Sequence, residues 1–279
     1  MGHKTREYDF SDRDFNVIRQ LVMARTGISL SEAKRDMVYS RLSRRLRQLD
    51  ISTFKDYCAL VSTDESEEHG HFVNAITTNL TAFFREEHHF HYLKDTLLPE
   101  LMANKSATRQ IRIWSAGCST GEEPYSLAMV LKENLPQAAG WDVKILASDL
   151  DTNVLAKAAE GVYDEERVSG ISAQRLKRWF KRGKGSRQGK VRVSSELRDM
   201  ICFRQINLME EWPLRGPFDF MFCRNVVIYF DKPTQRVLFN RYADLLADDA
   251  RLFVGHSESL YKVTDRFELI GNTIYQKRK

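Results

Sequence analysis

The first third of the chain shows apolar residues at helical spacing. They recur at intervals of three and four positions, and Ser11 and Ser31 stand where helices would begin. The pattern predicts a helix from Ser11 to near Gly27, followed by helices at 32–49, 53–61, 68–78 and 87–103. No segment here alternates polar and apolar residues as a half-buried strand does. We expect a small all-α domain over residues 1–78, and a linker with a connecting helix over 79–106.

From residue 107 the pattern changes to buried strands that alternate with helices. Apolar runs predict strands at 110–115, 143–149, 217–223 and 251–255. The predicted helices lie at 122–134, 151–159 and 233–247. A Gly-Asn pair separates the runs 267–270 and 273–276, which predicts a terminal hairpin. This order is typical of an α/β fold with a mostly parallel, doubly wound, Rossmann-like sheet over 107–279, with its last strand antiparallel to its neighbour.

Residues 162–200 interrupt the alternation and predict a small inserted β-subdomain. Glycines make a turn at 183–189, and residues 190–193 alternate as a short strand does. The segment is also basic, because residues 175–198 carry a net charge of +9, whereas the whole chain carries +5. Residues 34–47 form a second basic patch with a net charge of +5. Such patches favour anionic partners, although two solvated faces would give the same counts.

Composition and targeting signals limit where the protein acts. The 279 residues contain no apolar run of about 18 residues and no apolar signal at the start, so no membrane insertion is expected. The four cysteines lie far apart without a CxxC pair, which argues against disulfides and zinc. His88, His89 and His91 lack acidic partners at metal spacing, so no metal is expected. These features favour a cytoplasmic protein.

The turn after the first predicted strand is where an open α/β sheet meets its ligand. Its glycines, Gly117 and Gly121, fit neither a phosphate-binding loop nor the G-x-G-x-x-G spacing. Glu122 and Glu123 open the next helix, where carboxylates would repel a pyrophosphate. They suit a cationic ligand such as S-adenosylmethionine (SAM), and Asp149 stands where ribose hydroxyls are bound. Helix-dipole stabilisation would explain the glutamates alone, but not the glycines, Asp149 and the final hairpin together.

Five sequence motifs stand out, in order along the chain. They are Thr77–Arg85 (TTNLTAFFR), Ser119–Ser126 (STGEEPYS), Ala147–Asp151 (ASDLD), Phe222–Phe230 (FCRNVVIYF) and Gly255–Glu258 (GHSE). Together they closely resemble the chemotaxis receptor methyltransferases, the CheR family, from about residue 11 to residue 276. The resemblance implies a helical domain, a SAM-dependent methyltransferase sheet and an inserted β-subdomain. It also implies methyl transfer from SAM to receptor glutamates, which yields glutamyl methyl esters and S-adenosyl-L-homocysteine.

The same resemblance implies a set of site residues. The cofactor-binding positions carried over by motif are Asn79, Thr81, Arg85, Gly117, Glu123, Asp149, Asn207, Leu208, Arg224 and Asn225. A glutamate nucleophile is already ionised at neutral pH, so no general base is required and the transfer depends on positioning. We expect Arg85 and Tyr229 to act as catalytic residues that orient the incoming carboxylate. His256 follows the last core strand, and a structural role and a role near the pocket both stay open.

The family also implies protein partners. The expected receptor-recognition residues lie on the second helix and are Arg41, Arg44, Arg45 and Arg47. In some members the β-subdomain docks a peptide at the receptor C-terminus, which predicts docking at Gly183, Gly185, Gly189 and Arg192. Such a tether raises the local concentration of substrate more than it changes the chemistry. The expected partners are chemoreceptor cytoplasmic domains, and the expected state is a monomer recruited to membrane receptor arrays.

Three other functions are alternatives to receptor methylation. Methylation of nucleic acid would explain the basic patches, but residues 223–229 lack the Asp/Asn-Pro-Pro-aromatic signature of amino-group methylation, and no RNA-binding module is evident. A non-catalytic SAM- or peptide-binding module would keep Asp149 and the glycines and lack Arg85 or Tyr229, but both residues are present. NAD-dependent oxidoreduction does not fit the glycine spacing. A nucleic-acid methyltransferase is the alternative that stays open.

Overall fold

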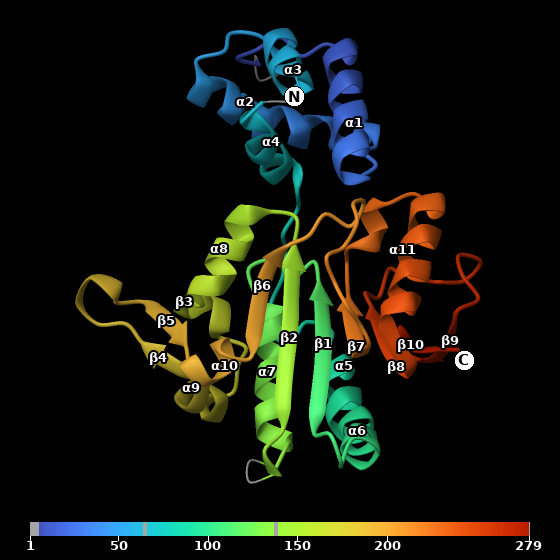
Figure 1. The fold of residues 1–279 in the computed structure, drawn as a ribbon. Coiled ribbons are helices and arrows are strands. Elements are labelled where there is room, and N and C mark those ends of the chain that lie inside the picture. The colour runs from blue at the N-terminus through green and yellow to red at the C-terminus, as the bar shows by residue number, and fades with distance from the viewer. Residues whose placement is uncertain (1–5, 64–65, 137–138, 279) are drawn as a thin grey trace.

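A computed structural model describes residues 6–63, 66–136 and 139–278 of the chain. Figure 1 shows a helical domain at one end, joined by an extended linker to a larger α/β domain. The helices of the first domain are α1 (Asp12–Thr26), η1 (Glu32–Lys34), α2 (Arg35–Leu49), α3 (Phe54–Ser62) and α4 (Glu68–Ile76). They confirm the helices predicted from apolar spacing, with a 3-10 turn as the first turn of the second one.

Local sequence explains where α1 begins and ends. The Ser11 hydroxyl accepts a hydrogen bond from the Asp14 amide at 3.2 Å, and the Asp14 carboxylate accepts from the Ser11 amide at 2.9 Å. Gly27 ends the helix at φ +71°, a conformation that favours glycine. The apolar face of α2 is buried as predicted, except at Leu49, which is 38% exposed.

The α/β domain is built on a seven-stranded sheet in the order β6-β2-β1-β7-β8-β10-β9. The strands are β1 (Gln110–Ala116), β2 (Asp142–Asp149), β6 (Ile201–Gln205), β7 (Phe218–Cys223), β8 (Leu246–Val254), β9 (Phe267–Gly271) and β10 (Ile274–Lys277). Neighbours are parallel except at β10, which is antiparallel to β8 and β9. The parallel sheet and its terminal hairpin are confirmed, but the edge strand β6 was not predicted.

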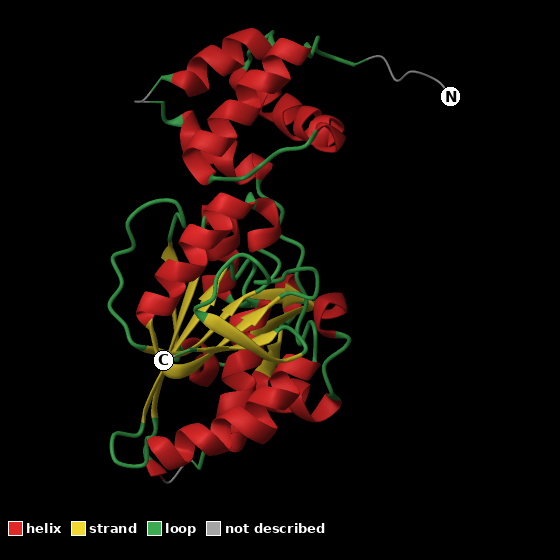
Figure 2. Cartoon of the chain, turned by 90° about the vertical axis from the view of Figure 1, so that its right-hand side faces the viewer, coloured by secondary structure: helices red, strands yellow, loops and turns green. Residues whose placement is uncertain are grey.

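Helices cover both faces of this sheet, as the rotated view in Figure 2 shows. They are α5 (His88–Tyr92), η2 (Leu93–Leu97), α6 (Leu98–Asn104), α7 (Glu122–Asn134), α8 (Thr152–Glu160), η6 (Val227–Tyr229) and α11 (Lys232–Leu245). The segment from α5 to α6 and α7 pack against Ile111 and Ile113 of β1 in one apolar cluster. On the opposite face, α11 packs against Trp114 and Met221.

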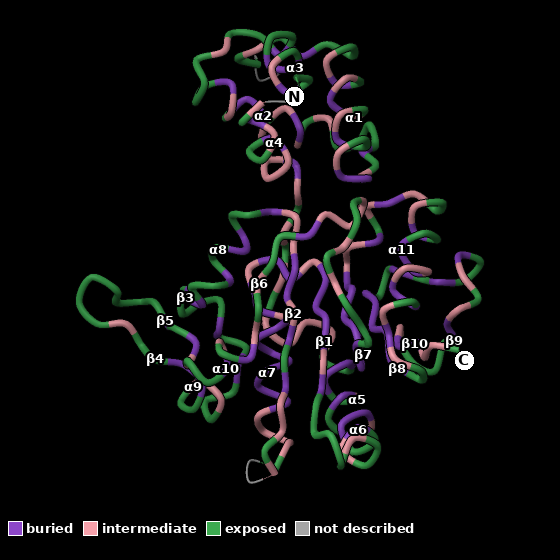
Figure 3. Tube along the Cα trace, in the orientation of Figure 1, coloured by how far each residue is buried: buried purple, intermediate pink, exposed green. Residues whose placement is uncertain are grey.

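The inserted segment forms the expected β-subdomain. Its elements are β3 (Val162–Asp164), η4 (Glu165–Val168), α9 (Ala173–Trp179), β4 (Phe180–Arg182), η5 (Gly185–Arg187), β5 (Lys190–Val193) and α10 (Ser195–Arg198). The predicted strand is β5, the middle strand of an antiparallel sheet ordered β3-β5-β4. Val191 and Val193 are buried in the same cluster as α7, while the loop between β4 and β5 is exposed (Figure 3).

The helical domain lies over the carboxyl ends of the parallel strands (Figure 1). Hydrogen bonds join it to the sheet domain there: the Ser29 amide donates to the Tyr229 carbonyl at 2.8 Å, and the Asn207 side chain donates to the Arg25 carbonyl at 2.8 Å. Asn74 of α4 also exchanges two hydrogen bonds with Thr152 at the start of α8. These contacts close one side of the space above the sheet.

Candidate active site

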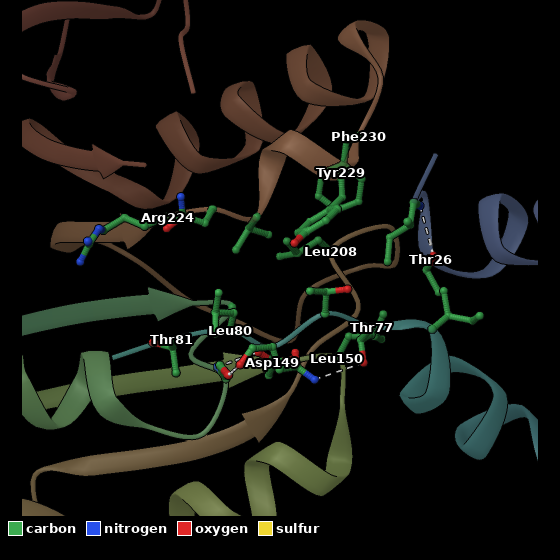
Figure 4. Close-up of a pocket in the computed structure, with 18 of the residues that line it drawn as sticks. Thr26, Thr77, Leu80, Thr81, Asp149, Leu150, Leu208, Arg224, Tyr229 and Phe230 are labelled. Atoms are coloured by element: carbon green, nitrogen blue, oxygen red, sulfur yellow. Dashed lines mark hydrogen bonds between the residues drawn. The ribbon is translucent and has the colours of Figure 1, made fainter. Parts of the chain in front are cut away.

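A pocket lies between the helical domain and the carboxyl edge of the sheet (Figure 4). It borders the point where the strand order reverses, between β1 and β7, which is where open α/β sheets bind ligands. The structure brings together every residue predicted to bind the cofactor or to act in catalysis. The pocket-lining residues among them are Asn79, Thr81, Arg85, Gly117, Glu123, Asp149, Asn207, Leu208, Arg224, Asn225 and Tyr229.

The turn after β1 brings the main chain close to the pocket. The amides of Gly117 and Cys118 both donate to the Ser148 carbonyl, at 2.7 and 2.9 Å. Gly117 has φ +73°, and a Cβ atom built on it would lie 2.2 Å from the Cγ2 atom of Val226. Only glycine satisfies both the backbone conformation and this contact. The turn is therefore held tightly between β2 and the turn after β7.

Asp149 ends β2 beside the same turn. One carboxylate oxygen accepts from the Ser119 amide at 2.8 Å, and the other accepts from the Asp151 amide at 3.0 Å. Burial raises the pKa of Asp149, although these amide hydrogen bonds act in the opposite direction. Each oxygen keeps a further lone pair, so the carboxylate is able to accept hydrogen bonds from the two hydroxyls of a ribose.

The two glutamates that open α7 have different surroundings. Glu122 is fully buried and pairs with Arg167 of the inserted subdomain. Glu123 accepts from the Ser115 hydroxyl at 2.7 Å and lies 3.3 Å from Arg224, and burial raises its pKa. Glu123 lines the pocket, whereas Glu122 does not.

Arg224 follows β7 and is a buried cation. Its side chain is 2% exposed and lies 3.3 Å from the carboxylates of both Glu86 and Glu123. It also donates to the main-chain carbonyl of Arg85. In Figure 4 its side chain extends away from Tyr229, so the guanidinium lies behind the pocket wall. The group supports the wall from that position.

Arg85 and Tyr229 line the pocket from two different segments, the linker and the turn after β7. Arg85 belongs to a linker turn in which Phe84 and Glu86 both have φ +55°, and its guanidinium donates to the Leu80 carbonyl at 2.9 Å. Tyr229 ends η6, and its hydroxyl points into the pocket in Figure 4. Both side chains are half-buried, so each has a face open to an incoming group.

The sequence analysis missed residues that hold the pocket together. Asp151 accepts hydrogen bonds from the Thr77 hydroxyl and from the side-chain Nδ2 of Asn79, each at 2.7 Å, and thereby ties the linker to α8. Glu86 was also missed; burial alone would raise its pKa, but hydrogen bonds from His256 and the charge of Arg224 lower it to about 2. Asp151 ends the motif at 147–151, and Glu86 directly follows the motif at 77–85. This position in the sequence was the only sign of their role.

The basic residues of α2 are largely occupied within the domain. Arg41 donates to the carbonyls of residues 75–77 at the end of α4, and burial lowers its pKa. Arg45 pairs with the buried Glu68 at 2.7 Å. Arg47 pairs with Glu7 at the surface at 3.1 Å. Within the described residues, Arg44 is exposed and has no such partner.

The predicted peptide-docking residues lie in the inserted subdomain, outside the pocket. Gly185 and Gly189 have φ +60° and +79° in the loop between β4 and β5, with open space around them. A Cβ on Gly183 would lie 2.0 Å from the Arg187 carbonyl oxygen. Arg192 is exposed on β5 and donates to the Glu160 carbonyl at 3.3 Å. These glycines shape the loop between β4 and β5 and do not line the cofactor pocket.

The polar groups that line the pocket fit SAM. Carboxylates at Asp149 and Glu123 suit its hydroxyls and its cationic groups, and the turn at Gly117 permits close approach of the main chain. The described ranges contain no cluster of three His, Cys, Asp or Glu side chains able to hold a metal ion. No helix in the described part of the chain is long and apolar enough to cross a membrane.

The doubly wound sheet, the glycine turn and the acidic end of β2 define a SAM-dependent methyltransferase with a Rossmann-like fold. The chain belongs to the CheR methyltransferase family: residues 13–77 match its all-alpha domain and residues 79–276 match its SAM-binding domain. It is 47% identical to chemotaxis protein methyltransferase 2 of Pseudomonas aeruginosa, covering 97% of this chain and 95% of that one. It is 45% identical to the chemotaxis protein methyltransferase of Escherichia coli, covering 99% and 94%.

Proposed function

We propose that this enzyme transfers the methyl group of SAM to glutamate side chains in the cytoplasmic domains of chemoreceptors. The products are glutamyl methyl esters and S-adenosyl-L-homocysteine. One observation carries the proposal: two groups suited to binding a carboxylate, Arg85 and Tyr229, face one pocket whose other walls suit SAM. The names of the relatives, which are chemotaxis protein methyltransferases, support the choice of acceptor.

The pocket residues would share the binding of SAM. Asp149 would accept from the ribose hydroxyls, and Asn207 and Leu208 would bracket the adenine. Glu123 would offset the positive charge of the ligand, because Arg224 balances only part of the negative charge that Glu123 and Glu86 carry. SAM, when bound, supplies an electrophilic methyl group on a sulfonium.

The chain's own residues then act by positioning the acceptor. A glutamate side chain has an unperturbed pKa of about 4.3, so the nucleophile enters ionised and needs no base. We assign Arg85 and the Tyr229 hydroxyl to hold that carboxylate in line with the methyl group. Held geometry of this kind supplies about 7–11 kcal/mol of barrier reduction. A very tight Arg–carboxylate pair would weaken the nucleophile, so an orienting contact is the better assignment.

Receptor recognition would use the two basic regions differently. Arg44 and Arg47 are exposed and would face an acidic receptor surface, whereas Arg45 is committed to Glu68. The loop around Gly185 and Gly189 in the inserted subdomain would hold a receptor C-terminal peptide and raise the local substrate concentration. Recruitment to membrane receptors would follow from these contacts.

The experiment is transfer of label from methyl-labelled SAM to receptor-containing membranes, scored as volatile methanol released by alkali. The wild type should label receptor protein. Arg85→Ala should lower kcat about 100-fold, because it removes a positioning contact. Tyr229→Phe should lower kcat while the Kd for SAM, measured by calorimetry, stays the same. Absence of label with intact SAM binding would reject the proposed acceptor, and label on added nucleic acid would favour the alternative.

A further inference from the structure

The Gly255–Glu258 motif lies outside the pocket lining, although it directly follows β8. Cys223 at the end of β7 and Val254 at the end of β8 are register partners in neighbouring parallel strands. The segments that follow them therefore leave the sheet side by side. One carries Asn225 and Tyr229 on the pocket wall, and the other carries His256 and Glu258 behind that wall.

Glu258 holds the turn that leads to Tyr229. Glu258 is 5% exposed, and its carboxylate accepts from the amides of Asn225 at 2.9 Å, Ile228 at 3.2 Å and Gly255 at 2.6 Å. Asn225 has φ +59°, in the left-handed region that asparagine adopts more readily than most residues with a side chain. The Glu258 carboxylate fixes this turn by accepting hydrogen bonds from amides at both of its ends. Among the described residues no cation pairs with Glu258, so backbone amides hold its carboxylate.

His256 contacts the linker through Glu86. Its ring Nδ1 lies 2.9 Å from a Glu86 carboxylate oxygen, and its main-chain amide donates to the same oxygen at 3.2 Å. The second oxygen of Glu86 lies 3.3 Å from Arg224, which in turn donates to the Arg85 carbonyl. His256 itself is 67% exposed, so it acts on the pocket only through this chain of contacts.

We infer that the side chains of His256 and Glu258 form a clamp that positions both groups facing the acceptor carboxylate: Glu258 acts through the Tyr229 turn and His256 acts through Glu86 on the Arg85 turn. Both are positioning residues, because neither lines the pocket. The expected effect on kcat rests on the proposed function, whereas the expected effect on hydrogen exchange does not. The clamp gives a role to a motif that lies behind the pocket wall and does not itself line the pocket.

The first test needs no substrate. Hydrogen exchange measured by mass spectrometry should show residues 224–230 exchanging about tenfold faster in Glu258→Gln, because an amide group replaces one acceptor of buried N–H groups. His256→Ala should accelerate exchange in residues 83–88 instead. Ser257→Ala is the matched control, since its side chain is exposed and makes no hydrogen bond within the described residues, and it should leave both segments unchanged. Unchanged exchange in both clamp variants would overturn the inference, whether or not the enzyme methylates receptors.

The second test is kinetic. Glu258→Gln should lower kcat about tenfold, with the KM for SAM changed less than about threefold. It should lower kcat by a smaller factor in a Tyr229→Phe background, because it acts through Tyr229. An equal factor in both backgrounds would mean a merely structural role and would contradict the clamp. His256→Ala provides the test if Glu258→Gln fails to fold, since an exposed side chain is replaced; an unchanged kcat there would also count against it.

Discussion

Replacing Gly117 with alanine tests whether the turn after β1 shapes the SAM site. The new Cβ would lie 2.2 Å from the Cγ2 atom of Val226, whereas carbon atoms in contact stay about 3.5–4.0 Å apart. Overpacking of this kind costs about 1–3 kcal/mol, and the left-handed backbone adds about 1–2 kcal/mol for a residue with a side chain. The domain should survive this cost, because its stability is of the order of 5–15 kcal/mol.

The steric share of that cost should appear as lost SAM affinity. If Val226 moves aside, the adjoining Asn225 moves with it, and both line the pocket. A penalty of about 1–3 kcal/mol raises the Kd for SAM about 5- to 150-fold in calorimetry. Gly140→Ala is the control, because Gly140 has φ +65° with nothing within 4 Å of its built Cβ; it should lose some stability and keep its SAM affinity. Gly117→Ala binding SAM within about twofold of wild type would refute the reasoning.

Three further predictions concern other parts of the molecule. Arg45→Met should destabilise the helical domain by about 3–5 kcal/mol in calorimetric unfolding, because it leaves the buried Glu68 carboxylate without its cationic partner; a change below 1 kcal/mol would contradict this. Arg44→Glu should leave the unfolding free energy within about 0.5 kcal/mol of wild type, but raise the KM for receptor, more so at low salt. An unchanged KM would remove Arg44 from the receptor surface. Burial lowers the pKa of His89 to about 3, so between pH 6.5 and 3 the unfolded chain binds a proton that the folded chain does not. The unfolding free energy should therefore fall with decreasing pH, and His89→Gln should lack up to about 1.4 kcal/mol per pH unit of that slope in urea titrations; identical slopes would refute the buried neutral imidazole.

Hydrophobic spacing predicted most helices and strands, because buried strands and amphipathic helices each give a regular order of apolar residues along the chain. The edge strand β6 was missed because its residues are mostly exposed or half-buried, so Ile201–Gln205 shows no buried run. The same limit applies to α2. Its period identified a basic arc, but it did not reveal that α4 covers Arg41 or that Glu68 neutralises Arg45. Periodicity identifies a face and leaves its partner unknown.

The candidate site was accessible because its residues lie in contiguous motifs at the ends of strands. The supporting contacts were not accessible, because they join residues far apart in the chain. Glu86 and His256 are 170 positions apart, and Arg224 lies 139 positions after Arg85. Only the parallel pairing of β7 with β8 and the path of the linker bring these groups together. The sequence showed the motifs, and the packing relates them to one another.

The central claim is tested most directly by identifying the atom that receives the methyl group. The enzyme, methyl-labelled SAM, a receptor cytoplasmic fragment and duplex DNA are incubated together, and both acceptors are analysed by mass spectrometry. The account predicts methyl groups on glutamate side-chain carboxylates of the receptor, which mild alkali removes and which form about 100-fold more slowly with Arg85→Ala. Methyl groups on DNA, or on receptor nitrogen atoms that resist alkali, would contradict it.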